Sequence, residues 1–157
     1  MPGLNLPEGT LLVITPLSGA TALILTPYAA RGLTQTLTLV GAGGSQSFWI
    51  RRDVNGFMRN VADDRFRKYK SVVSCRDGET PCLDGAFAGE VVEVSCVQEL
   101  SFPVGATPTR SAVPGSVRTY NGITYYRPLL TMMVADISNS FQEWQAINGW
   151  SITLEEV

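Results

Sequence analysis

Alternation of apolar and polar residues is the dominant pattern along this chain, and it predicts β-strands. In residues 33–39, Leu33, Leu37 and Leu39 fall on one face together with Gln35, while the threonines share the other. A period of two residues is the period of a strand, so this segment predicts a strand with one covered face.

Residues 90–102 carry the strongest strand pattern. Val92, Val94, Cys96 and Gln98 fall on one face, so we expect that face in the core; the other face carries Val91, Glu93, Ser95, Val97 and Glu99. Residues 103–115 follow with three prolines, two glycines and no periodicity, which predicts an irregular loop of the kind that often serves binding.

Three segments predict β-hairpins. Residues 12–16 and 23–27 are near copies that each end in proline, which stops a strand because it cannot donate to the ladder. Residues 47–52 lead into Asn55-Gly56, a pair that tolerates the positive φ of tight turns.

The third hairpin spans residues 117–126 around Asn121-Gly122. A two-residue type I′ turn there pairs Arg118 with Tyr125 on one face, and we expect the guanidinium to lie over the ring.

Helical spacing competes with the strand pattern only near the C-terminus. Ser140 and Glu143 have the spacing of a capping box, and the helical intervals continue at Phe141, Trp144 and Ile147. The spacing predicts one short helix over residues 141–148, followed by a strand over 150–157. The alternative is a hairpin turn at Asn148-Gly149, which would mix polar and apolar residues on one strand face.

Together these patterns predict a mainly β protein, a β-sandwich or barrel of antiparallel strands with one short C-terminal helix. Residues 1–44 are expected to form an N-terminal β-hairpin arm, with a glycine-rich hinge at 41–45. Residues 45–157 are expected to form the main β domain, which carries the Pro-rich loop 103–115.

Composition narrows the chemistry. The 157 residues are 45% hydrophobic and 17% charged, as in a folded domain, and they include no histidine. The usual general base and the commonest metal ligand are therefore missing. The adjacent carboxylates Asp63-Asp64 and Glu155-Glu156 are expected in solvent, because neighbours in sequence rarely face each other across a cleft. We expect no enzyme activity and no cofactor.

The cysteines give no stronger signal. Cys75, Cys82 and Cys96 are expected to be reduced, small hydrophobic residues. Cys75 and Cys82 flank a turn-rich segment, so a disulfide between them remains an alternative, and their spacing matches no usual zinc site. No apolar run reaches the ~20 residues of a membrane span, and no secretory signal is recognisable, so we expect synthesis in the cytoplasm.

Charge is unevenly distributed. Seven of the twelve basic residues lie in residues 51–70, whereas residues 77–99 hold six acids and no base, and the net charge is −2. Such opposite-sign segments suit contacts between protein subunits.

The segments YAARGLTQ (28–35), RDVNG (52–56) and FRKY (66–69), together with residues 127–157, resemble small tail proteins of long-tailed bacteriophages. The resemblance implies a β-sandwich or barrel with long arms, repeated in rings around the tail axis. It implies a structural subunit of a virion, made in the host cytoplasm, most simply in the tail or baseplate; a capsid decoration or head-to-tail connector protein is the alternative in the same class.

The contacts expected on this basis involve the chain itself, as a trimeric or hexameric ring, and other virion proteins. The basic side is Arg51, Arg52, Arg59, Arg65, Arg67 and Lys68, and the acidic side is Glu90, Glu93 and Glu99. A loop expected to reach across carries Thr107, Pro108, Arg110 and Pro114.

A single-stranded nucleic-acid-binding β-barrel is the alternative from another class. Aromatic residues at 49, 57, 66 and 69 interleave with the cations of residues 51–70, as in surfaces that stack bases. Three aspartates reduce the local excess to +4, so nucleic acid is the less favoured partner.

Overall fold

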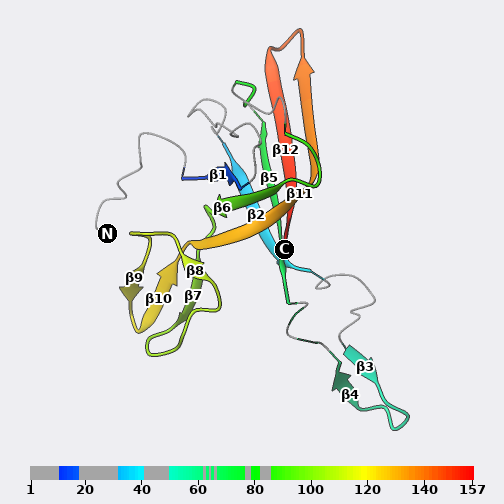
Figure 1. Cartoon of the computed structure of the whole chain (residues 1–157), viewed down its shortest axis with the longest axis vertical. Helices are drawn as coiled ribbons and strands as arrows, with labels where there is room; N and C mark the ends of the chain where they lie inside the picture. Colours follow the sequence, from blue (N-terminus) through cyan, green and yellow to red (C-terminus); the bar gives the residue numbers. More distant parts are fainter. Residues whose placement is uncertain are drawn as a thin grey trace.

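The structure, a computed structural model, describes residues 11–17, 32–40, 50–61, 63, 65, 67–76, 79–81 and 86–157. These residues are mainly β, in antiparallel sheets (Figure 1). The strands within the described residues are β1 (Val13–Pro16), β2 (Thr34–Leu39), β3 (Ile50–Arg52), β4 (Met58–Asn60), β5 (Tyr69–Arg76), β6 (Val91–Ser95), β7 (Leu100–Pro103), β8 (Ser111–Ala112), β9 (Arg118–Tyr120), β10 (Ile123–Tyr126), β11 (Pro128–Gln142) and β12 (Ile147–Glu156).

The largest sheet has the strand order β1-β6-β11-β12-β5-β2, and β8 pairs with the start of β11. Every ladder in it is antiparallel. β7, β10 and β9 form a second sheet, and β3 and β4 form a separate hairpin. In Figure 1 the β3–β4 hairpin projects at one end of the molecule, and the turn between β11 and β12 lies at the other.

β11 is the long central strand, and it changes partner along its length. β6 pairs along one edge from Leu129 to Met133, and β12 pairs along the other edge from Met132 to Gln142. A β-bulge between Val134 and Asp136 shifts the register by one residue. Because one extra residue reverses the alternation, Val134 points into the core before the bulge, and Ile137 shares the inner face with Ile152 after it.

One face of the large sheet carries the hydrophobic core. The buried residues are Leu12, Ile14, Val73, Cys75, Val92, Val94, Cys96, Leu130, Met132, Val134, Trp150, Ile152 and Leu154. β-branched and sulfur-containing side chains at alternate positions fit a pleated, half-buried surface, which explains why these segments are strands. The expected core positions Val92, Val94 and Cys96 are confirmed, whereas Gln98 is exposed.

The sheet curls so that its edge strand β2 reaches the chain that follows β6. The side chain of Gln35 makes this link: its Oε1 accepts from the amides of Val97 at 2.6 Å and Gln98 at 3.1 Å. Its Nε2 donates to Ser71 Oγ at 3.0 Å. The link runs through a side chain and not through a ladder, so the described strands form no closed barrel.

The hairpin predicted around Asn121-Gly122 is confirmed in its register. Ile123 pairs with Tyr120, and Tyr125 pairs with Arg118. Asn121 and Gly122 both have positive φ, as a type I′ turn requires. The Arg118 guanidinium lies 4.6 Å from the centroid of the Tyr125 ring, which confirms the expected cation–π contact.

The prediction of a helix over residues 141–148 is wrong. β11 continues to Gln142, and β12 begins at Ile147, so a four-residue turn joins two long strands. The turn residue with positive φ is Ala146, at 51°, so no glycine or asparagine marks the turn in the sequence. Hydrogen bonds between β11 and β12 outweigh the local preference of Ser140 and Glu143 for a helix start. The alternative turn at Asn148-Gly149 is also wrong, because both residues lie in β12.

The single strand predicted over residues 90–102 is two strands in different sheets. β6 ends at Ser95 and β7 begins at Leu100. The break falls where the amide of Cys96 donates to Pro128 O and the next two amides donate to Gln35. Long-range hydrogen bonds therefore end the strand. The Pro-rich loop, expected to be irregular throughout, contains the short strand β8, which pairs with β11.

The strands described within residues 1–44, β1 and β2, pair with strands of the large sheet, and the domain boundary expected at residue 44 stays a prediction. Ile14 of β1 lies in the core, and β2 pairs along β5. The second strand expected at 23–27 and the hinge expected at 41–45 lie outside the described residues.

Candidate interaction surfaces

A hollow lined by four cationic side chains, called the cationic hollow below, lies on the surface of the described residues. It has a volume of about 520 Å³, and its lining is Leu39, Arg65, Arg67, Lys68, Tyr69, Thr109, Arg110 and Glu156. The chain just before β5, the Pro-rich loop and the last strand meet there. Four of the expected contact residues, Arg65, Arg67, Lys68 and Arg110, are thus brought to one place.

Arg110 is the organising residue of the cationic hollow. Its guanidinium donates to Glu156 Oε1 at 2.6 Å and to Oε2 at 3.0 Å, and to Arg67 O at 2.8 Å. It also lies 5.4 Å from the centre of the Tyr69 ring. The Glu156 carboxylate raises the pKa of Arg110 from its usual value. Arg110 therefore fastens the Pro-rich loop to its own chain.

Glu156 was expected in solvent, and that expectation is wrong. Its side chain is only 10% exposed, and its Oε2 also accepts from the amide of Tyr69 at 2.9 Å. Its neighbour Glu155 points to the opposite face and pairs with Lys70 at 3.5 Å. Strand alternation separates the two carboxylates, which excludes them as an acid–base pair.

The remaining cations of the hollow have different surroundings. Arg65 is held by Asp63, with the closest contact at 2.7 Å, and that hydrogen bond lowers the pKa of Asp63. Lys68 Nζ donates to Val157 O at 2.7 Å. Among the described residues that line or adjoin the hollow, four side chains are cationic and two, Asp63 and Glu156, are carboxylates. Positive charge therefore prevails in the hollow.

The β3–β4 hairpin holds the other three expected cations and is called the arginine hairpin below (residues 50–60). Arg59 pairs with Asp53 at 3.2 Å, and Asp53 Oδ1 also accepts from the amides of Asn55 and Phe57, which fixes the turn. Arg52 donates to Gly56 O at 2.9 Å. Its strand residues are all exposed.

The three expected acidic residues do not form one surface. Glu99 pairs with Arg118 of the same chain at 2.6 Å, and that bond lowers the pKa of Glu99. Glu93 is half-buried in β6, opposite Thr15 of β1 and Thr131 of β11. Glu90 lies in the turn before β6, where its carbonyl accepts from Val134 N. In the loop, Thr107, Pro108 and Pro114 are exposed.

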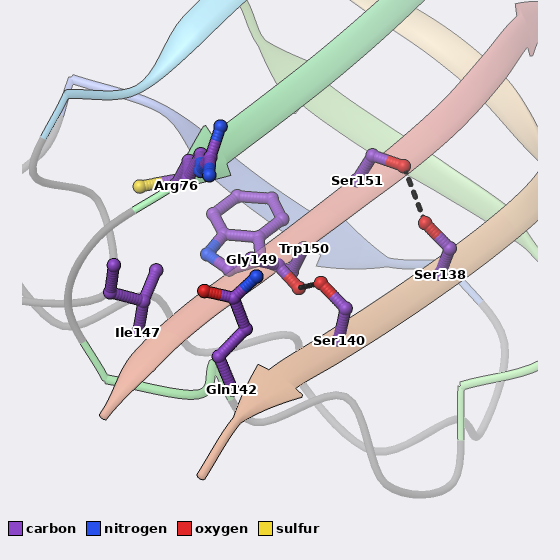
Figure 2. Close-up of a pocket in the computed structure, with 9 residues that line it drawn as sticks. Arg76, Ser138, Ser140, Gln142, Ile147, Gly149, Trp150 and Ser151 are labelled. Atoms are coloured by element: carbon purple, nitrogen blue, oxygen red, sulfur yellow. Dashed lines mark hydrogen bonds between the residues drawn. The ribbon is translucent and has the colours of Figure 1, made fainter. Parts of the chain in front are cut away.

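A shallow pocket lies on the open face of the sheet, between β11, β12 and β5 (Figure 2). It has a volume of about 300 Å³. Ser138 Oγ and Ser151 Oγ are 2.7 Å apart, and Ser140 Oγ donates to Gly149 O at 3.2 Å. No general base stands beside these hydroxyls in the described pocket lining, so they have no means of activation as nucleophiles.

The buried cysteines are chemically quiet. Cys75 and Cys96 are both buried, and burial raises the pKa of Cys96 to about 11, which suppresses its reactive thiolate. Cys82 lies outside the described residues, so the disulfide alternative is untested there. Within the described ranges, no group of three or more potential ligands is placed to hold a metal, and no helix could cross a bilayer.

Two exposed aromatic residues were not predicted as contact residues. Trp144, in the β11–β12 turn, is 98% exposed, and Phe141 beside it is 67% exposed. The helix predicted over residues 141–148 puts Phe141 and Trp144 on one helix face with Ile147, so neither aromatic side chain was expected at an exposed turn.

No family model, no curated protein and no solved structure matches this chain.

Proposed function

We propose that this chain is a structural subunit of a virion of a long-tailed bacteriophage, in the tail or baseplate. It acts by self-association and by docking other virion proteins, is made in the host cytoplasm and functions in the particle. The observation that carries the proposal concerns two hairpins, the arginine hairpin and the β11–β12 hairpin. They project at opposite ends of the molecule and expose aliphatic, aromatic and charged side chains. Exposed apolar side chains of this size are typical of protein interaction sites.

The chemistry of the chain supports a mechanical role. It has no histidine, and the serines of the shallow pocket hydrogen-bond to each other and to the backbone. The cationic hollow is built around an ion pair within the chain, between Arg110 and Glu156, which shapes its surface.

The experiment is light-scattering mass after size exclusion over a range of protein concentrations, with negative-stain imaging of the peak. The expected result is a trimer, a hexamer or a ring. The R65E/R67E variant should lower the assembled fraction while its circular dichroism stays unchanged, because both side chains are exposed at the rim of the cationic hollow. A stable monomer that clears peptidoglycan suspensions would overturn the proposal.

A capsid decoration or head-to-tail connector protein is the alternative within the class, and binding to purified heads against purified tails separates the two. The cationic hollow also favours a second candidate, a single-stranded nucleic-acid binder. Against it, Arg110 already covers the Tyr69 ring that a base would use. Oligonucleotide binding with a steep dependence on salt would favour this second candidate.

A further inference from the structure

The two ends of the molecule carry opposite charge. The arginine hairpin has three arginines and one aspartate, so its net charge is +2. The outer part of the β11–β12 pair, residues 136–151, has Asp136, Glu143 and no cation, so its net charge is −2. We name this second segment the distal hairpin. One cation of the described residues adjoins it: Arg76 of β5 pairs with Gly149, close to the β11–β12 turn, and reduces the local net charge to −1, which is still opposite in sign to the arginine hairpin.

Both hairpins expose large apolar side chains beside these charges. On the arginine hairpin Val54, Phe57 and Met58 are 101%, 67% and 61% exposed. On the distal hairpin Phe141 and Trp144 are 67% and 98% exposed. Each hairpin therefore combines exposed apolar side chains with a net charge opposite in sign to that of the other hairpin.

The distal hairpin also has an open edge. β11 pairs with β6 only as far as Met133, and beyond that residue it pairs with β12 alone among the described strands. An unpaired strand edge can accept an extended segment through main-chain hydrogen bonds.

The two hairpins cannot meet within one copy. They lie at opposite ends of the longest axis of the molecule, with the large sheet between them (Figure 1). Their complementary charges can be used only between copies.

We propose that the arginine hairpin of one copy docks on the distal hairpin of a second copy, so that copies associate head to tail. This inference rests on the proposed self-association and assigns the surfaces that make it. A head-to-tail contact is heterologous, so its repetition closes a ring where the rotation allows and otherwise extends a filament.

The test uses two charge-reversed variants of the whole chain, R51E/R52E and D136R/E143R. Alone, each variant brings like charges together at the contact, and its self-association in sedimentation at low salt should weaken at least about tenfold. Mixed in equal amounts, the two variants should associate again, because each one then offers the charge that the other lacks. A chain with all four substitutions should associate like the original and serves as the control for net charge.

Three results would overturn the inference. If the original chain associates and both variants associate equally well, the contact lies elsewhere, and the proposed function stands. If the mixture is not rescued although both variants remain folded, charge pairing between the hairpins is excluded. If the original chain is a monomer at its highest soluble concentration, the contact does not form, and the proposed function is then judged by docking to other virion proteins.

Local damage to the arginine hairpin is controlled by a milder variant. Arg52 donates to Gly56 O, whereas Arg51 makes no hydrogen bond or ion pair with the described residues. R51E alone should therefore keep the turn intact and still weaken association in the same direction.

Discussion

Arg110 and Glu156 form a two-bonded ion pair, at 2.6 and 3.0 Å, that joins the Pro-rich loop to the last strand. Their side chains are 23% and 10% exposed, so water screens this pair less than any other ion pair described in the chain. The pair holds the wall of the cationic hollow in place.

Removing one partner of this pair should destabilise the fold. R110A leaves the Glu156 carboxylate poorly solvated with the Tyr69 amide as its remaining described donor, so we expect a loss of about 2 kcal/mol in the free energy of unfolding. Urea denaturation measures it. R118A is the control, because its pair with Glu99 is 59% and 35% exposed, so solvent screens it and its loss should cost clearly less. Equal losses for the two variants would contradict the prediction.

Gln35 should contribute more to stability than its exposure suggests. Q35A leaves the amides of Val97 and Gln98 without their acceptor and Ser71 without its donor, so we expect a loss of about 2 kcal/mol. Thermal and urea unfolding measure it. T36A, on the open face of the same strand, is the control and should change stability by less than about 0.5 kcal/mol.

The turn between β11 and β12 should be improved by glycine. Ala146 has a φ of 51°, which a Cβ disfavours, so A146G is expected to raise the free energy of unfolding by about 0.5 to 1 kcal/mol. If residues 141–148 were helical, glycine would destabilise the protein instead. The sign of the change therefore tests the hairpin directly.

Gly149 should resist a side chain because of one neighbour. A Cβ at this position would lie 2.9 Å from Ser140 Oγ, which must then turn away from its bond to Gly149 O. We expect G149A to cost about 1 kcal/mol in the original chain. In the S140A background that cost should disappear, and a double-mutant cycle measures the coupling. A zero coupling energy would contradict the described contact.

Cys96 should make stability fall at alkaline pH. Its pKa rises from 9.0 to about 11 in the folded chain because burial disfavours the thiolate. The unfolded chain therefore releases this proton first, and the stabilising contribution present below pH 9 is lost as the pH rises towards about 11. C96A should show a smaller decline between pH 9 and 11 in urea denaturation. Identical slopes would show that Cys96 does not titrate in this way.

The sequence was most informative where local chemistry determined the structure. Asn121-Gly122 has the backbone freedom that a tight turn needs, so the register that pairs Arg118 with Tyr125 could be predicted. Alternating apolar residues likewise identified the core valines of β6, because strand geometry follows from that period.

Prediction failed where distant residues decide the structure. Nothing near residue 96 shows that Gln35, about sixty positions earlier, takes up the amides that end β6. The turn at Ala146 has no local signal, and the spacing from Ser140 to Glu143 resembled a helix start. Only the cations of the cationic hollow were predicted as contact residues. Glu155 and Glu156 were both expected in solvent, but Glu156 is largely buried against Arg110, and only Glu155 lies in an exposed ion pair.

The bulge between Val134 and Asp136 marks a point in β11 where a residue can be lost without changing which side chains face the core. Deletion of Ala135 would remove the extra residue and restore strict alternation, with Asp136 still opposite Thr153 and Ile137 still opposite Ile152 on the inner face. Deletion of Thr131, in contrast, would place Leu130 or Met132 on the solvent face. Loss of one residue from the exposed turn at 143–146 would only shorten a loop. Length variation among natural or laboratory variants should therefore accumulate at the turn and at the bulge, and be absent from residues 129–134.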